Sequence, residues 1–281
     1  MLPPLPGWIT SAPTDSLDAA AFRSGAALAH LALAAGPTLP HALWRDRLAL
    51  AAAEVCLGHC GRREGAKALR DAVHLTKAGD DPGPAGRVFR QWSRAVAGPV
   101  SVAHLGRALE GVPLERIGLC LDATGPTPVD RAAQVIKVVL SDHPRRETEA
   151  LILADAALSR SLGWPHVLPL LSLALRPRDL RLREDDLRLA CYRAVVAGAG
   201  QAAPLAAELA RAAARLQAVA PNLRAKGAAR AVEIFLSRDA LAPTALDFMS
   251  DRAARRLCDR LVELGVVREL TGRDTFRLYG L

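Results

Sequence analysis

The C-terminal stretch 249–281, MSDRAARRLCDRLVELGVVRELTGRDTFRLYGL, decides how the fold of this chain is interpreted. Ser250 is a favourable N-cap, and Asp251 places a negative charge in the first turn, where it suits the helix dipole. Apolar residues then recur at helical spacing up to Gly265, a residue type that commonly ends helices. They are Ala254, Leu257, Cys258, Leu261 and Leu264. The pattern predicts an amphipathic helix over 250–264.

After Gly265 the spacing of apolar residues changes from helical to alternating. Two such runs, 266–270 and 276–279, flank the turn-forming sequence Thr-Gly-Arg-Asp at 271–274, which predicts a β-hairpin. Upstream, the pattern predicts a helix over 223–236 and a short helix over 243–249. Helix, short helix, longer helix and hairpin is the order of a winged helix-turn-helix module, which we assign to residues 221–281.

Residues 1–220 are expected to form an all-helical domain. The chain is 51% hydrophobic but only 4% aromatic, and it is rich in Ala and Leu, so it has little material for a large sheet. The fold class is therefore mainly α, as a multi-helix bundle or an irregular helical array. Pro and Gly divide this part into expected helices. They cover 16–35, 40–61, 64–76, 88–96, 101–109, 113–121, 127–140, 144–162, 165–175 and a long stretch ending at 219, which Pro204 is expected to kink or split.

Duplex DNA is the partner that this module predicts. The third helix of a helix-turn-helix protein enters the major groove, and an adjacent wing can reach the backbone. The candidate contacts are the arginines of the third helix and of the wing, namely Arg252, Arg255, Arg256, Arg260, Arg273 and Arg277. The chain would then be a non-enzymatic DNA-associated protein, and regulation and plasmid or chromosome maintenance both stay open as roles.

A second hypothesis is an interaction subunit that uses the same module to dock a protein or to form a homodimer. Three acids, Asp251, Asp259 and Glu263, share the exposed helix face with the arginines, and Arg255 with Asp259 has ordinary i,i+4 spacing. The net charge of +8 is spread along the chain, so it permits a polyanionic partner without locating one.

A third hypothesis is a metal-dependent enzyme with its site in the helical body. Asp71, His74, Asp80 and Asp81 lie near the glycine-rich break 79–86 and could offer oxygen and nitrogen ligands. Asp-Asp-Pro-Gly is also ordinary turn chemistry, and we favour capping by these aspartates. No phosphate-binding loop, dinucleotide fingerprint or other common catalytic motif is present, so no cofactor and no catalytic residue is predicted.

Smaller features favour structural interpretations and a cytoplasmic location. Trp44 and Trp92 are expected in the helical core. The five cysteines are an odd, scattered set, which fits reduced thiols better than disulfides. The N-terminus lacks the pattern of a signal peptide, and no uninterrupted apolar stretch is long enough for a membrane span, so no membrane association is expected.

Three stretches of the chain resemble a bacterial family catalogued as domain-of-unknown-function family number 1403. They are 69–87 (LRDAVHLTKAGDDPGPAGR), 219–228 (VAPNLRAKGA) and 249–281, and the resemblance covers nearly the whole chain. The family has no assigned activity, so the resemblance implies a bacterial protein and carries over no catalytic residue. The last stretch also resembles the winged-helix tails of other bacterial proteins, which favours the fold and no particular activity.

Overall fold

The structure is a computed structural model that describes residues 4–10, 15–77, 79–273 and 275–281. It is mainly helical, as expected, with one small sheet among the described residues. The α-helices are α1 (Gly7–Thr10), α2 (Leu17–Ala34), α3 (His41–His59), α4 (Ala66–His74), α5 (Gly83–Ala97), α6 (Val102–Ala108), α7 (Leu114–Leu121), α8 (Pro128–Asp142), α9 (Glu147–Ser161), α10 (Glu184–Val219), α11 (Ala228–Phe235) and α12 (Asp251–Glu263). The 3₁₀ turns are η1 (Asp179–Arg181), η2 (Ala220–Asn222) and η3 (Pro243–Ala245), and the strands are β1 (Arg268–Glu269) and β2 (Tyr279–Gly280).

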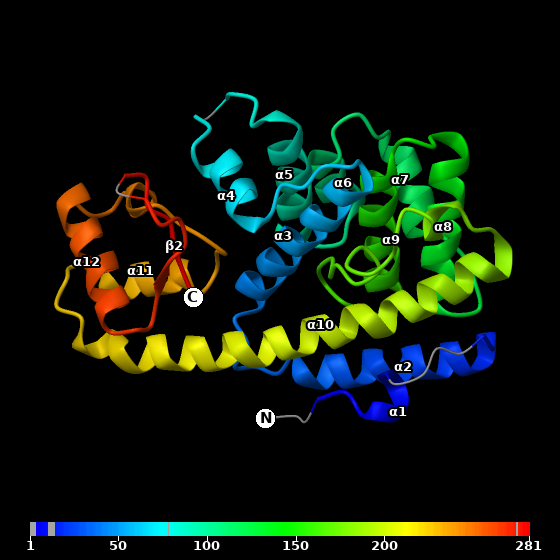
Figure 1. The fold of residues 1–281 in the computed structure, drawn as a ribbon, viewed down its shortest axis with the longest axis horizontal. Helices are drawn as coiled ribbons and strands as arrows, with labels where there is room; N and C mark the ends of the chain where they lie inside the picture. Colours follow the sequence, from blue (N-terminus) through cyan, green and yellow to red (C-terminus); the bar gives the residue numbers. More distant parts are fainter. Residues whose placement is uncertain (1–3, 11–14, 78, 274) are drawn as a thin grey trace.

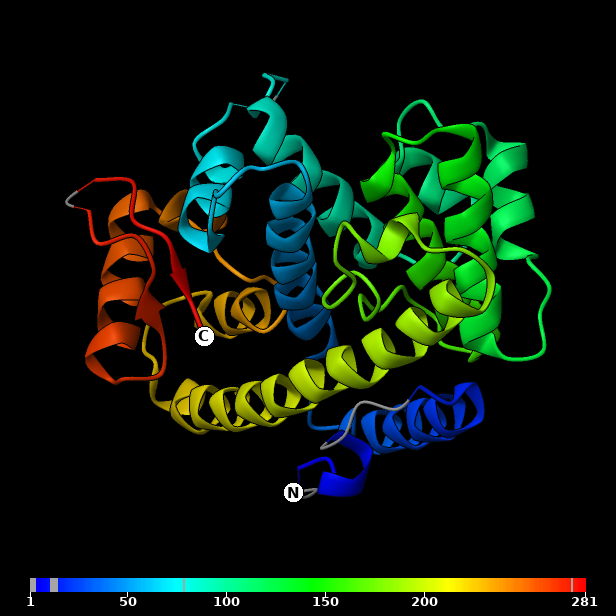
Figure 2. The same cartoon turned by 45° about the vertical axis from the view of Figure 1, so that its right-hand side comes forward.

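Helix α10 runs along nearly the full length of the molecule and connects its two ends (Figure 1). Its first half packs against α2 and α8, and its last turns lie beneath α11 and α12 (Figures 1 and 2). The many alanines of α10 allow neighbouring helices to approach closely. Pro204 lies inside one continuous helix, so the split expected at this residue does not occur.

Helix α9 lies at the centre of the body, and every residue from 150 to 159 is buried. Its Asp155 carboxylate accepts hydrogen bonds from the backbone N–H groups of Leu170 (3.0 Å), Leu171 (2.9 Å) and Ser172 (3.2 Å) and from the Ser172 hydroxyl (2.7 Å). Burial raises the pKa of Asp155 to about 6, against the effect of these donors. The helix expected over 165–175 is wrong because this carboxylate holds the segment as an irregular loop.

The two tryptophans expected in the core are buried there. Trp44 donates a hydrogen bond from Nε1 to the carbonyl oxygen of Ala202 (3.0 Å), which joins α3 to α10. Trp92 on α5 donates from Nε1 to Sγ of Cys56 (3.4 Å). None of the helices in the described part of the chain combines the length and apolar content needed to cross a membrane.

In the segment 221–281, for which the module is predicted, α11, η3 and α12 are followed by β1 and β2. The short helix expected over 243–249 is wrong, because only the 3₁₀ turn η3 (Pro243–Ala245) forms there. Strands β1 and β2 are antiparallel, with Glu269 opposite Tyr279, and Leu241 makes an isolated antiparallel bridge to the other side of Tyr279. Helix α11 begins at residue 228 rather than 223, after Gly227 in the left-handed conformation (φ 90°). Phe235 and Val232 of α11 face inward, as expected, and short 3₁₀ turn η3 precedes α12.

A buried charge cluster fixes this module on the body. The Asp239 side chain, only 2% exposed, forms ion pairs with Arg47 of α3 and with Arg70 of α4, whose Nε lies 2.6 Å from Oδ2. The backbone N–H of Asp239 donates to Asp46 (2.9 Å), and burial raises the pKa of that carboxyl group. Arg47 also donates to the carbonyl oxygen of Leu281 (3.0 Å). The module is thus held at its first loop and at its last residue.

Asp239→Asn should lower the free energy of unfolding by about 3 kcal/mol, because it leaves two partly buried guanidinium groups without their carboxylate. Urea denaturation followed by circular dichroism measures the loss. The control is Glu110→Gln, which breaks the exposed pair of Arg94 and Glu110 and should change stability by less than about 0.5 kcal/mol. Equal losses in the two variants would show that the Asp239 cluster does not anchor the module.

Candidate nucleic-acid interface

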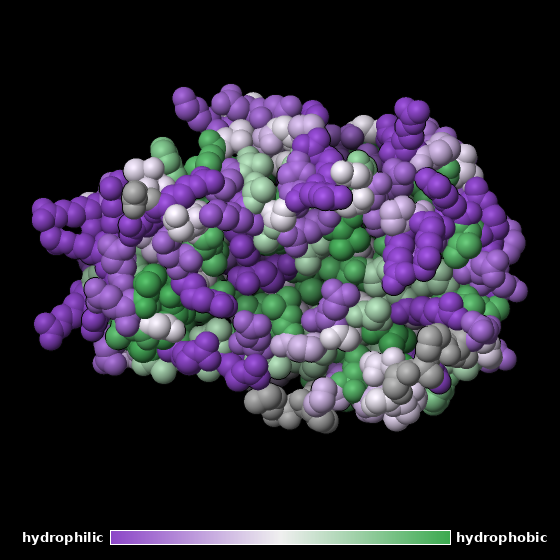
Figure 3. All heavy atoms as spheres, viewed as in Figure 1, coloured by the Kyte–Doolittle hydropathy of each residue, from purple (hydrophilic) through white to green (hydrophobic). Residues whose placement is uncertain are grey.

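Helix α12 lies at one end of the molecule, on the side of the module that faces away from the body (Figure 1). Hydrophilic side chains project into solvent at this end (Figure 3). The Ser250 hydroxyl accepts a hydrogen bond from the backbone N–H of Ala253 (3.3 Å), which confirms the expected N-cap, and Gly265 (φ 67°) follows the last turn. The two ends of α12 are therefore as expected, and one face of the helix is open to solvent.

The buried stripe of α12 differs from the expectation at one residue. Ala254, Leu257, Cys258 and Leu261 are buried, whereas Leu264 is 38% exposed. Leu264 is the C-cap residue, where the helix ends and its side chain leaves the packed face. Burial raises the pKa of the Cys258 thiol to about 12, so this cysteine behaves as a neutral core residue.

The four arginines of α12 are all exposed, and two of them pair with acids of the same helix. Arg255 pairs with Asp251 (2.8 Å) and Arg260 with Glu263 (3.0 Å). The expected pairing of Arg255 with Asp259 is wrong. Asp259 instead accepts a hydrogen bond from the hydroxyl of Tyr279 (3.3 Å), because the hairpin brings that phenol against the helix.

Arg252 and Arg256 differ from the other two arginines of this helix. Both are exposed, and neither forms an ion pair with any residue that the structure describes. They stand four residues apart, so their side chains project one above the other from the same face. They form a short row of positive charge that no described acidic residue pairs with.

The two arginines expected on a wing, Arg273 and Arg277, are held closer to the body than the sequence indicated. Arg273 forms an ion pair with Asp71 of α4, and Arg277 donates from Nε to the carbonyl oxygen of Arg273 (3.0 Å). Asp274 lies outside the described residues. Because residues 71 and 273 are 202 positions apart, no local pattern could predict this contact. It ties the segment between β1 and β2 to α4.

One basic residue near α12 was missed by the sequence analysis. The Arg230 guanidinium lies over the ring of Phe248, 4.4 Å from its centroid, just before the start of α12. A lone arginine on a short helix gives no signal for such a contact. The whole module carries eleven Arg and Lys residues against eight Asp and Glu residues, so its excess of positive charge is modest.

The structure does not bring the metal-ligand candidates together as a site. Asp71 pairs with Arg273, and Asp81 pairs with Arg87 (3.3 Å) while accepting a hydrogen bond from the backbone N–H of Gly83 (3.0 Å). Asp80 and His74 are exposed on the same segment. Across the described residues, no group of three or more His, Cys, Asp and Glu side chains could hold a metal ion. The capping expected of Asp81 is confirmed.

Comparison with known families places the whole chain in one group. The model of a family described as protein of unknown function DUF1403 matches residues 1–281. The chain belongs to the DUF1403 family. No curated protein matches it. The family resemblance inferred from the sequence motifs is thereby confirmed. The family description gives no function for this DUF1403 protein.

Ser250→Ala in the DUF1403 chain should lower the free energy of unfolding by about 1 kcal/mol, because it removes the acceptor of the Ala253 N–H. The control is Ser237→Ala, whose exposed hydroxyl donates to the carbonyl oxygen of Ile234 and caps no helix N-terminus. Chemical denaturation of both variants gives the comparison. If Ser250→Ala is no more destabilising than Ser237→Ala, the capping hydroxyl does not hold the start of α12.

Proposed function

We propose that residues 221–281 form a winged helix-turn-helix module that binds duplex DNA through α12. The order of elements supports the fold, since α11, η3 and α12 are followed by the antiparallel pair β1 and β2. The bridge of Leu241 to Tyr279 adds a third extended segment between α11 and η3. A core of three helical segments against a small antiparallel sheet presents its last helix to the major groove.

The pair Arg252 and Arg256 is the observation that carries the binding proposal. An exposed arginine without an internal acid gains most from a phosphate, because no existing ion pair has to be broken. Arg255 and Arg260 have carboxylates of their own helix as counterions and so gain less. With the modest net charge of the module, this predicts binding of moderate affinity, with a salt dependence set by a small number of phosphate contacts.

The test is the salt dependence of binding to a fluorescently labelled random duplex, measured by anisotropy. For the parent protein the logarithm of the binding constant should fall linearly with the logarithm of salt concentration. Arg252→Ala combined with Arg256→Ala should reduce the slope by about two, one for each lost phosphate contact. Arg255→Ala combined with Arg260→Ala should reduce it by less, since both arginines are already paired.

The matched control is the double variant Arg181→Ala with Arg183→Ala. Both arginines are exposed on the body near the start of α10, at the end opposite to α12, and neither has an ion pair among the described residues. This variant should keep the parent slope. The proposal fails if the parent shows no salt-dependent binding or if the control loses as much as the α12 variant.

The exposed Phe276 favours protein docking as a second function of the same module. This ring is 73% exposed on the wing, at a residue with positive φ (55°), and it borders a hollow of about 460 Å³ that Pro243, Arg255 and Tyr279 help to line. A solvent-exposed aromatic side chain is a common anchor at protein interfaces. A second copy of the chain is the simplest partner.

Phe276→Ser should weaken self-association if this ring anchors a homodimer, because the interface loses its apolar contact. Sedimentation velocity across a range of protein concentrations measures the association. Phe22→Ser, which removes another exposed aromatic ring far from the wing, is the control and should leave association unchanged. A parent that stays monomeric at every concentration contradicts the docking hypothesis and leaves the DNA proposal to its own test.

A further inference from the structure

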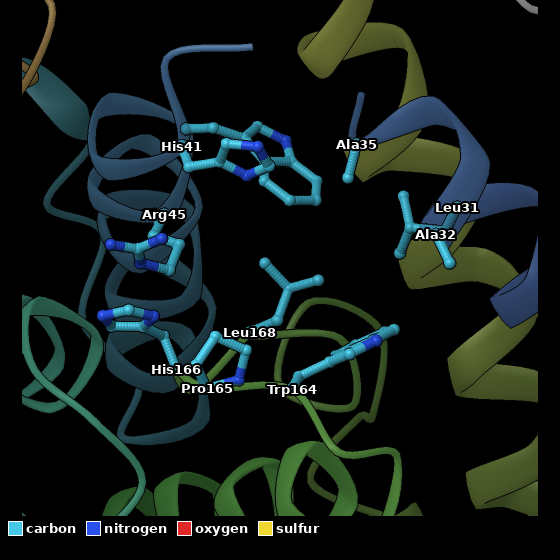
Figure 4. Close-up of a pocket in the computed structure, with 10 residues that line it drawn as sticks. Leu31, Ala32, Ala35, His41, Arg45, Trp164, Pro165, His166 and Leu168 are labelled. Atoms are coloured by element: carbon cyan, nitrogen blue, oxygen red, sulfur yellow. The ribbon is translucent and has the colours of Figure 1, made fainter. Parts of the chain in front are cut away.

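A pocket of about 250 Å³ lies between the end of α2, the start of α3 and the loop that follows α9. It is separate from α12 and the wing. Figure 4 shows Arg45 and His166 close together on one side of the pocket, with Leu31, Ala32 and Ala35 on the opposite side. Its two sides therefore differ in chemistry, one being basic and the other apolar.

The basic side of the pocket contains the guanidinium group of Arg45, which has no carboxylate partner among the described residues. Arg45 is half-buried, and its Nε donates to the carbonyl oxygen of Val96 (3.1 Å). No ion pair joins Arg45 to a carboxylate of the described chain, and burial lowers its pKa from the usual value. Arg45 lines the pocket, and no hydrogen bond from its two terminal NH₂ groups is formed within the described residues. Two such groups can bind a carboxylate with two parallel hydrogen bonds.

Two imidazoles, those of His166 and His41, also line this side of the pocket. Burial, followed by the charges of Arg45, His104 and His41, lowers the pKa of His166, so its neutral ring can donate one N–H. His41 lies edge-on to Trp44, with ring centroids 6.4 Å apart. None of the described residues that line the pocket is acidic. Partly buried positive charge without a counterion favours an anionic guest.

The remaining walls are apolar and aromatic. Trp164, Leu31 and Leu168 line the pocket with the small side chains of Ala32 and Ala35 (Figure 4). A cavity of about 150 Å³ lined by aliphatic and aromatic side chains already holds benzene. The volume here accommodates one aromatic ring together with a carboxylate.

The pocket is also rigid, because backbone hydrogen bonds fix its walls. The Val100 N–H donates to the carbonyl oxygen of Pro165 (2.9 Å), and His166 pairs with Pro99 in an antiparallel bridge. The Trp164 N–H donates to the carbonyl oxygen of Ser159 (2.9 Å). A site formed in advance loses little entropy when it takes up a ligand.

We infer that this pocket binds a small aromatic monocarboxylate, with the carboxylate on the NH₂ groups of Arg45 and the ring between Trp164 and the apolar end of α2. The inference goes beyond the proposed DNA binding and does not depend on it. The two opposed sides of the pocket define this ligand, since Arg45 selects a carboxylate and the apolar end of α2 selects an aromatic ring.

The experiment is isothermal titration of the full chain with benzoate, and with acetate and benzyl alcohol as probes that each lack one half of the ligand. Benzoate should bind at least about tenfold more tightly than either. Arg45→Gln should weaken benzoate binding by about tenfold or more and leave benzyl alcohol nearly unchanged. Ala32→Phe, at an exposed residue that lines the pocket, should fill the site and abolish binding without altering the melting temperature.

The matched control is Arg131→Gln. Arg131 also donates from Nε to a backbone carbonyl, that of Gly125 (3.2 Å), but it lies outside the pocket, so benzoate binding should be unchanged. If benzoate binds no more tightly than acetate, the apolar wall does not contribute to binding and the inference is wrong. Binding equal to that of benzyl alcohol, or binding that survives Ala32→Phe, would overturn the assignment of the site.

Discussion

The position of the C-terminal module depends on the buried carboxylate of Asp239. Arg47 and Arg70 reach it from two different helices, and its own N–H is held by Asp46. A charge buried this deeply is tolerated only with its partners in place, so the loop between α11 and η3 has one stable position on the body. Leu241 follows directly and pairs with Tyr279, so the same contact fixes where the small sheet lies.

Helix α3 contacts both the C-terminal module and the pocket beside α2. Four consecutive residues divide its tasks, since Trp44 bonds to α10, Arg45 borders the aromatic pocket, and Asp46 and Arg47 hold the module. Successive residues of a helix point about 100° apart, which lets one segment face three neighbours at once. The pocket and the module are therefore attached to the same rigid element.

The charges of the module show why a simple count of arginines is a poor guide to binding. Arg255, Arg260 and Arg273 have acidic partners within the protein, while Arg252 and Arg256 have none among the described residues. An exposed pair adds little stability, but it does lower the charge offered to a phosphate. The DNA proposal thus rests on two residues and on their place on the outward face of α12.

The sequence by itself determined the helical class, the limits of α12 and the burial of Trp44 and Trp92. These follow from local spacing, capping and composition, which act over a few residues. Only the tertiary structure decided that Asp155 keeps 165–175 from forming a helix, that Asp71 pairs with Arg273, and that Arg45 and Trp164 line one pocket. Those outcomes depend on residues far apart in the chain, whose distances are set by packing and leave no periodic trace in the sequence.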